Sequence, residues 1–450
     1  MITYGTINAD KVHYDASGTV TAADEAAFLA NTVARQPTDL FVISHGWNND
    51  EVEADGLYQR FFTAVDNVAS SVPAFDRTKS FALAVIWPSK SFDENAFAAA
   101  VGPQASAAAG LGGPSPVDAQ IANQLQTLKE IANNPASDQF LDHAIAQIPL
   151  LSVSQSAQDD FVAALASAFG LQPSSPDPGL DNGLVMASST SGHTVLAQLA
   201  ANLQLGPAAA RAARGGVGGA AGIGSVGAAA GFNPLAGIKN AALALANLTT
   251  YYTMKERAGV VGRTGVAQTV VKALAALPAA KVHVIGHSFG GVVVTSVVNA
   301  LPGETPGHRA ATMTLLQAAY SHYGMAHDYQ PNTDGLYRSV VTGGKVASQI
   351  QITHSVHDLA VGLAYPLASA LAHQIGQAAW INPYGGMGGD GAQATPEAFN
   401  DTLRAVGTAY SPIVSPNIVR NLNGDAIIKS HGDVTHDEIA YAVLLAASLA

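Results

Sequence analysis

The chain has 450 residues, and 21 Lys and Arg against 33 Asp and Glu give it a formal net charge of −12 at pH 7. Apolar residues make up 48% of the chain, so it can bury a large core, and disorder over its whole length is excluded. The acidic balance and the lack of a basic cluster argue against nucleic-acid binding. No cysteine is present, which excludes disulfides, thiol nucleophiles, zinc–thiolate sites and iron–sulfur clusters.

The N-terminal sequence lacks the basic segment followed by an apolar segment that defines a secretory signal, so a cytoplasmic location is expected. An uncharged stretch at 215–237 is long enough to cross a membrane, but it consists mostly of Gly and Ala. Because Leu, Ile and Phe are the residues that favour insertion, no stable membrane span is expected.

Short apolar runs alternate with amphipathic segments along much of the chain. A short apolar run between polar residues is typical of a strand buried on both faces of a parallel sheet. Strands that alternate with helices predict an α/β fold with a mostly parallel, doubly wound sheet. We expect strands at 2–7, 12–14, 40–43, 81–87, 282–285, 313–318 and 346–353, and helices at 22–35, 264–277 and 438–449.

The alternation breaks between residues 91 and 245, where charged residues are scarce and Gly and Ala are abundant. We interpret 91–245 as a mainly helical cap that divides the α/β core into a first part, 1–90, and a second part, 246–450. The tract at 206–237 is rich in Gly and Ala and close to low complexity, which predicts a mobile portion. The cap is either an apolar lid over a site for hydrophobic substrates or a structural subdomain without a catalytic part.

The most specific motif is Gly286-His287-Ser288-Phe289-Gly290, a match to G-x-S-x-G. It lies between a strand-like apolar run and a helix-like sequence, as a nucleophile elbow requires. In such an elbow the glycines make room for a tight turn, and strain lifts the serine Oγ above the sheet. Ser288 is therefore the predicted nucleophile. A structural, glycine-rich strand end is the alternative.

A serine hydroxyl needs a histidine base, and a carboxylate has to hold that histidine. The expected order along the chain is nucleophile, acid, base. Asp358, after the last expected strand, is the predicted acid, and Asp328 is the alternative. His431 follows a strand-like run at 426–430 and is the predicted base. Its rival is His436, at the entry to the last helix.

The oxyanion of a tetrahedral intermediate needs at least two hydrogen-bond donors. One predicted donor is the N–H of Phe289, directly after the nucleophile. The other is the N–H of Trp47, in the loop after the strand at 40–43, where Gly46 allows the backbone to turn inward. A simple strand-to-helix turn is the alternative for that loop. The residues expected to contact substrate are His45, Gly46, His287 and Tyr320.

Two further sequences, at 222–227 and 386–391, match G-x-G-x-x-G. Neither follows a convincing strand or opens a nucleotide-binding βαβ unit, so both are interpreted as flexible loops. The chain also lacks a Walker A sequence and an H-E-x-x-H zinc motif. No cofactor and no metal are expected.

These motifs together resemble those of the serine α/β-hydrolases. The resemblance rests on His45-Gly46-Trp47, Trp87-Pro88-Ser89, the sequence GHSFGG at 286–291, and Asp358 and His431 in that order. The segment 251–262 also resembles the stretch before the nucleophile in a poorly characterised bacterial and fungal branch of esterase- or lipase-like proteins. The cap at 91–245 matches no known cap.

The resemblance implies an α/β-hydrolase fold and hydrolysis through an acyl-enzyme without metal or organic cofactor. Hydrophobic acyl or aryl esters are the expected substrates. Cleavage of amides, carbamates or polyesters, or acyl transfer, would use the same residues, because the acyl-enzyme is common to all of them. A non-catalytic binding protein on this fold is the third possibility.

Overall fold

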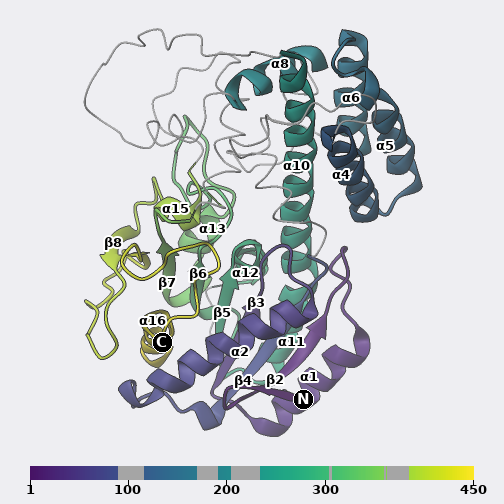
Figure 1. Cartoon of the computed structure of the whole chain (residues 1–450). Helices are drawn as coiled ribbons and strands as arrows, with labels where there is room; N and C mark the ends of the chain where they lie inside the picture. Colours follow the sequence, from purple (N-terminus) through teal and green to yellow (C-terminus); the bar gives the residue numbers. More distant parts are fainter. Residues whose placement is uncertain (90–115, 170–190, 204–233, 304–306, 359–360, 362–384) are drawn as a thin grey trace, which may run out of the picture.

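The computed structural model describes residues 1–89, 116–169, 191–203, 234–303, 307–358, 361 and 385–450. Among these residues, nine strands form one sheet (Figure 1). The strands are β1 (Ile2–Tyr4), β2 (Ile7–His13), β3 (Asp39–Ser44), β4 (Ser80–Ile86), β5 (Lys281–His287), β6 (Ala310–Leu316), β7 (Val346–His354), β8 (Ala398–Thr402) and β9 (Val419–Asn423).

The order in the sheet is β1-β2-β4-β3-β5-β6-β7-β9-β8. Only β1 runs antiparallel to its neighbour, and all other described pairs are parallel. Every residue of β4 and β6 is buried, which explains why the sequence of β4 after Ser80 is a continuous apolar run and why β6 contains no charged residue. The predicted α/β class with a mostly parallel sheet is confirmed.

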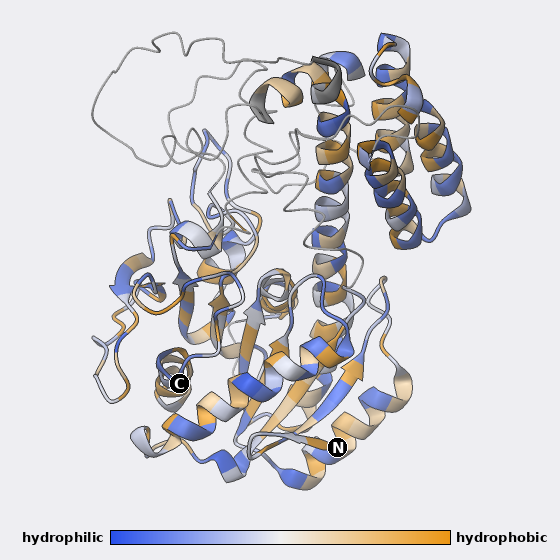
Figure 2. Ribbon diagram, viewed as in Figure 1, coloured by the Kyte–Doolittle hydropathy of each residue, from blue (hydrophilic) through white to orange (hydrophobic). Residues whose placement is uncertain are grey.

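Helices cover both faces of the sheet. One face, with Val42 and Leu83, packs against α1 (Ala22–Arg35), α11 (Ala267–Ala276) and α12 (Phe289–Ala300). The other face, with Ile43 and Ala84, packs against α2 (Glu51–Val68) and α16 (Asp437–Ser448). Adjacent strand residues therefore enter opposite cores, as the pleat requires. Figure 2 shows hydrophobic residues along the central strands and hydrophilic residues along the outer helices.

The described part of the predicted cap is helical. It consists of α4 (Pro116–Ala132), α5 (Pro135–Gln147), α6 (Gln155–Ala168), α8 (Gly192–Leu203) and the first half of α10 (Pro234–Val260). Figure 1 shows α10 rising from the α/β core into this group of helices. The boundary predicted at 245 falls inside α10, because no proline interrupts the sequence from Leu235 to Val260.

The structure differs from the sequence prediction at two places that matter for the site. A π-helical segment, Val261–Val266, joins α10 to α11, so no helix begins at 264. Residues 426–430 form a turn rather than a strand, and β9 is the strand that precedes His431. The sequence pattern hides β9 because Arg420 and Asn421 are buried there. Arg420 pairs with Asp401 of β8, so its charge is compensated inside the fold.

Short helical segments complete the described structure: η1 (Ala69–Ser71), η2 (Arg77–Lys79), η3 (Ile148–Leu150), α13 (Arg338–Thr342) and α15 (Met387–Asp390). In the part of the chain that the structure describes, no helix is both long and apolar enough to cross a membrane. The predicted mobile tract at 206–237 lies largely outside the described residues, and the motif at 222–227 lies entirely outside them.

Candidate active site

Ser288 occupies a sharp turn between β5 and α12. Its backbone has φ 56° and ψ −122°, a strained conformation for a residue with a side chain. A Cβ on Gly286 would lie 2.2 Å from the Gly290 carbonyl oxygen, and one on Gly290 would lie 2.2 Å from that of Ser44. The turn can be this tight only because these two positions are glycine. The motif thus forms a strand–turn–helix with a strained serine at its apex.

The loop after β3 lies directly against this turn. A Cβ on Gly46 would lie 2.6 Å from the Cβ of Ser288 and 3.2 Å from its Oγ. Trp47, the next residue, packs its ring against that of Phe289, with 5.8 Å between the ring centroids. The side chains of the two residues predicted to supply oxyanion donors therefore contact each other, next to Ser288.

Buried hydrogen bonds hold this loop in place. The hydroxyl of Tyr58 accepts from the N–H of His45 at 2.8 Å and donates to the carbonyl of Val85 at 2.6 Å. The indole N–H of Trp87 donates to the carbonyl of His45 at 3.2 Å. The carbonyl of Ser89 accepts from the N–H of Asn48 at 2.9 Å. The segment Trp87-Pro88-Ser89 after β4 is thus the support of the loop after β3.

The ring of His45 belongs to this support. It stacks on Trp87 at 5.5 Å between centroids, and its Nδ1 lies 2.9 Å from the carbonyl of Gly46. Burial lowers the pKa of His45 to about 4, so the ring is neutral at pH 7. Because only 1% of His45 is exposed, we assign it to shaping the loop rather than to direct substrate contact.

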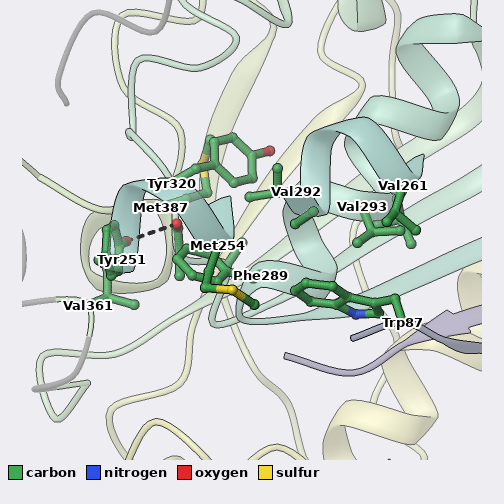
Figure 3. Close-up of a cluster of buried hydrophobic side chains, with 14 of the residues drawn as sticks. Trp87, Tyr251, Met254, Val261, Phe289, Val292, Val293, Tyr320, Val361 and Met387 are labelled. Carbon is green, nitrogen blue, oxygen red and sulfur yellow. Dashed lines mark hydrogen bonds between the residues drawn. The ribbon is translucent and has the colours of Figure 1, made fainter. Parts of the chain in front are cut away.

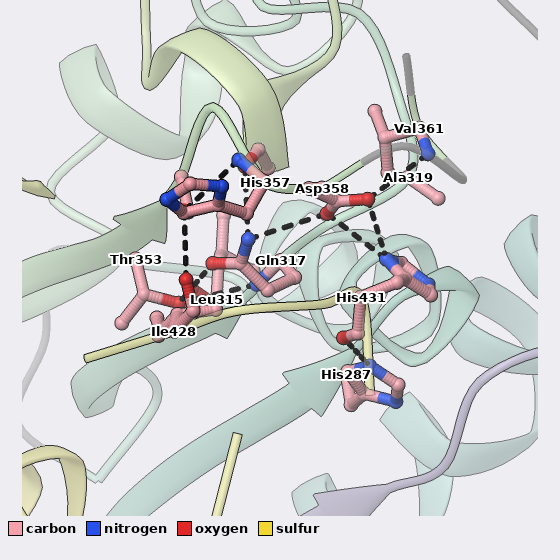
Figure 4. Close-up of polar contacts among 12 residues, drawn as sticks. His287, Leu315, Gln317, Ala319, Thr353, His357, Asp358, Val361, Ile428 and His431 are labelled. Atoms are coloured by element: carbon pink, nitrogen blue, oxygen red, sulfur yellow. Dashed lines mark hydrogen bonds and ion pairs between the residues drawn. The ribbon is translucent and has the colours of Figure 1, made fainter. Parts of the chain in front are cut away.

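His431 and Asp358 form a close pair beside the elbow. The Nδ1 of His431 lies 3.0 Å from Oδ1 and 2.9 Å from Oδ2 of Asp358 (Figure 4). Asp358 is fully buried, and its carboxylate also accepts from the amide of Gln317 at 3.2 Å and from the N–H of Val361 at 3.1 Å. Three donors therefore converge on this carboxylate, which compensates its burial.

The two rival residues lie elsewhere. Asp328 occupies an exposed turn with φ 46°, where its carboxylate accepts from the N–H of Asn332 at 2.6 Å. His436 is the N-cap residue of α16, and its Nε2 lies 2.7 Å from a carboxylate oxygen of Asp433. The structure thus brings together His431 and Asp358, whereas Asp328 and His436 contact residues close to them in the sequence.

Gln317 is a site residue that sequence reasoning missed. It follows β6 directly, is fully buried and has φ 46°. The hydroxyl of Thr353 donates to its Oε1 at 3.0 Å, so its Nε2 is free to donate to Asp358 and to the carbonyl of Gly388, at 3.2 and 3.0 Å. A polar residue at the carboxyl end of a buried parallel strand is the signal that could have found it.

The sequence at 386–391, predicted to be a flexible loop, is instead an ordered part of the site. It contains the short helix α15, and Met387, Gly388 and Gly389 are buried. A Cβ on Gly388 would lie 2.6 Å from the backbone of Gln317 and 2.9 Å from a carboxylate oxygen of Asp358. The prediction was wrong because these glycines allow close packing against Gln317 and the predicted acid, Asp358.

Two of the residues expected to contact substrate have other partners. Tyr320 is fully buried, and its hydroxyl lies 3.1 Å from that of Thr295, so it belongs to the core (Figure 3). The Nε2 of His287 lies 2.9 Å from the carbonyl of His431, and the two rings are 4.9 Å apart. His287 therefore contacts both the backbone and the ring of His431, the predicted base.

No hydrogen bond joins the hydroxyl of Ser288 to His431, although both residues lie within the described part of the chain. In proteins without bound substrate such a bond is often long and tightens when substrate binds. The proximity of the two residues follows from His287, which is adjacent to Ser288 and in contact with His431.

A cluster of buried aromatic and aliphatic side chains packs next to the elbow (Figure 3). Tyr251 of α10 packs against Phe289 at 4.8 Å and against Trp47 at 6.0 Å between centroids, and its hydroxyl donates to the carbonyl of Ala319 at 3.1 Å. The second half of α10, beyond the predicted cap, thus supplies an aromatic side chain beside the two predicted oxyanion residues. Val361 and Met254 belong to the same buried cluster.

Among the described residues, no group of three or more His, Asp or Glu is arranged to hold a metal ion. No protein-family model, curated protein or solved structure matches this chain.

Proposed function

We propose that this protein is a serine hydrolase with an α/β-hydrolase fold that cleaves carboxylic esters of hydrophobic acyl or aryl groups. The observation that carries the proposal is the contact between the buried Asp358 and the partly exposed His431, beside the strained Ser288. A serine on a strained turn, a histidine and a carboxylate in that order along the chain are the parts that acyl transfer through a covalent intermediate requires.

In this mechanism the Oγ of Ser288 attacks the ester carbonyl carbon, and the Nε2 of His431 takes the hydroxyl proton. Asp358 holds Nδ1–H, which fixes the tautomer with a bare Nε2 and stabilises the imidazolium that forms. The C–O bond to the alcohol then breaks, and His431 returns the proton to the leaving oxygen. Water attacks the acyl-enzyme with His431 again as base, which releases the acid and restores Ser288.

The N–H groups of Phe289 and Trp47 are the proposed oxyanion donors. Phe289 is the first residue of α12, and the first N–H groups of a helix have no carbonyl partner within the helix. The helix dipole adds partial positive charge at the same point. Trp47 follows Gly46, whose backbone already lies against Ser288. The proposed hydrophobic substrate rests on Trp47, whose ring is only partly buried and packs against the buried rings of Tyr251 and Phe289.

The test is hydrolysis of p-nitrophenyl esters from acetyl to dodecanoyl by wild type, Ser288→Ala and Ser430→Ala. Ser430 is an exposed serine next to His431, so its variant controls for the substitution itself. We expect Ser288→Ala to lower kcat by about 10³-fold or more with an unchanged melting temperature, and Ser430→Ala to resemble wild type. Near-normal turnover by Ser288→Ala, or no turnover of any ester by wild type, would contradict the proposal.

A further inference from the structure

His287, one residue before Ser288, contacts the backbone of the predicted base. Its Nε2 lies 2.9 Å from the carbonyl oxygen of His431. A carbonyl oxygen only accepts hydrogen bonds, so Nε2 carries the proton and donates. Burial lowers the pKa of His287 to about 3, so the ring is neutral and Nδ1 has no proton at pH 7. The contact therefore fixes one tautomer of this ring.

The base lies in a turn that has little support of its own. Ser430 and Gly432 are exposed, and a Cβ on Gly432 would meet no atom within 4 Å. The turn's own hydrogen bonds are local: the N–H of Asp433 donates to the carbonyl of Ser430 at 3.2 Å, that of Val434 to the carbonyl of Gly432 at 3.0 Å, and that of Lys429 to the carboxylate of Asp433 at 2.9 Å. Within the described part of the chain, the hydrogen-bond partners of His431 are Asp358 at its ring and His287 at its carbonyl.

The surroundings of His287 are mostly apolar, so packing alone would favour an apolar side chain at this position over a histidine. Only 9% of the residue is exposed, and its Nδ1 has no partner among the described residues. The ring also lines a cavity of about 10 Å³, whose other lining residues are mostly apolar: Ile43, Ser44, Leu57, Phe61, Ile285 and Leu316. Leaving a buried nitrogen without a partner costs free energy that an apolar side chain would not cost.

We propose that His287 is a positioning residue that anchors the backbone of the base to the strand carrying the nucleophile. The base is then held at two points: its ring by Asp358 and its carbonyl by His287. Two anchors fix the direction of Nε2 relative to Ser288, whereas one anchor leaves the exposed turn free to shift. A shift of about 1 Å at a reacting group can lower a rate by about 10²-fold.

Three substitutions separate the donor from the bulk of the side chain. Gln places an amide nitrogen at about the reach of the histidine Nε2, Asn reaches only as far as Nδ1, and Leu has no donor. We expect His287→Leu and His287→Asn to lower kcat for p-nitrophenyl butyrate about 10- to 100-fold with KM within twofold of wild type. His287→Gln is expected to recover kcat to within about threefold, because it restores the donor.

Backbone hydrogen exchange gives a readout that does not depend on activity. In the full-length chain, amides of residues 429–434 should exchange at least tenfold faster in His287→Leu and His287→Asn than in wild type and His287→Gln. Equal kcat in all four proteins, or an equal loss in all three variants with unchanged exchange at 429–434, would overturn the proposal. If His287→Leu does not fold, the Asn and Gln variants still decide between these outcomes.

The kcat measurements rest on the proposed function, whereas the hydrogen-exchange measurements do not. A wild-type protein that neither turns over esters nor labels with a fluorophosphonate would remove the proposed function. The anchor would then stand or fall on the exchange rates alone. Conversely, wild type and His287→Asn could hydrolyse esters equally well and show equal amide exchange at 429–434. That result would contradict the proposed role of His287 and leave the serine hydrolase assignment intact.

Discussion

The two sides of the candidate site are held by different means. On the nucleophile side, a methyl group at Gly46, Gly286 or Gly290 would approach a neighbouring atom to 2.6, 2.2 or 2.2 Å. On the base side, a methyl group at Gly432 would meet nothing within 4 Å. Close backbone packing therefore sets the position of Ser288, whereas hydrogen bonds from side chains set the position of His431. Substitutions on the two sides should accordingly fail in different ways.

The largest effect is expected on the base side, at Asp358. Asp358→Asn keeps the shape of the side chain but presents an amide to His431, which favours the wrong tautomer of the ring. We expect kcat for p-nitrophenyl esters to fall about 10⁴-fold. Measurement of kcat beside Asp328→Asn tests the choice of acid. Because Asp328 lies in an exposed turn, its variant should stay within twofold of wild type, and the reverse pattern would move the acid to Asp328.

Two glycine substitutions test the contrast itself. Gly46→Ala would push a methyl group into Ser288 and displace either the nucleophile or the loop, so we expect kcat to fall about 10²-fold. Gly432→Ala, next to the base, should leave both kcat and the melting temperature near wild type. Kinetics and thermal melts of the two variants are the measurement. Equal losses in both would show that the base turn is packed as tightly as the elbow.

The nucleophile side is also the side that sequence could predict. Ser288, Phe289, Gly46 and Trp47 occur in two short motifs, and each motif directly follows an apolar strand. Because the residues of one motif are neighbours along the backbone, the sequence alone places the members of each motif within a few ångströms of one another. The strands and helices of the core follow for the same reason: apolar periodicity is a local property of the sequence.

The base side depends on contacts that no local pattern encodes. Gln317, Thr353 and Gly388 come from three separate segments, and only folding brings them to Asp358. The strand β9 was missed because a buried arginine interrupts its apolar pattern, although Asp401 compensates the charge. Asp358 and His431 were predicted from their order along the chain, and the distance between them could come only from the structure.

A smaller effect is expected from the support of the loop after β3. Tyr58→Phe removes the hydroxyl that accepts from the buried N–H of His45 and donates to Val85. We expect the free energy of unfolding to fall by about 1–3 kcal/mol, because a buried N–H loses its acceptor. Urea unfolding of wild type and variant measures this. An unchanged midpoint would mean that water or another acceptor replaces the hydroxyl, and that the loop is held less tightly than its contacts indicate.

The smallest expected effect is on the pH dependence of stability. It involves both sides of the site, because the buried ring of His45 supports the loop beside Ser288 and that of His287 contacts His431. Burial lowers the pKa of His45 to about 4 and that of His287 to about 3, whereas an unfolded histidine titrates near 6.5. Between pH 7 and 5.5 the unfolded chain therefore takes up protons at these positions and the folded chain does not, so the contribution of these two groups to stability falls as the pH falls. Each ring should contribute about 1 kcal/mol to this fall.

His287→Gln removes one such contribution and leaves every other titrating group in place. These include His354, whose pKa burial also lowers, and His13, whose raised pKa acts in the opposite direction. The loss of unfolding free energy between pH 7 and 5.5 should therefore be about 1 kcal/mol smaller in the variant than in wild type. Urea unfolding of both proteins at the two pH values measures the difference. Equal losses of unfolding free energy in the two proteins would show that His287 titrates in the folded protein as it does in the unfolded chain. That result is incompatible with a neutral, buried ring that donates to His431.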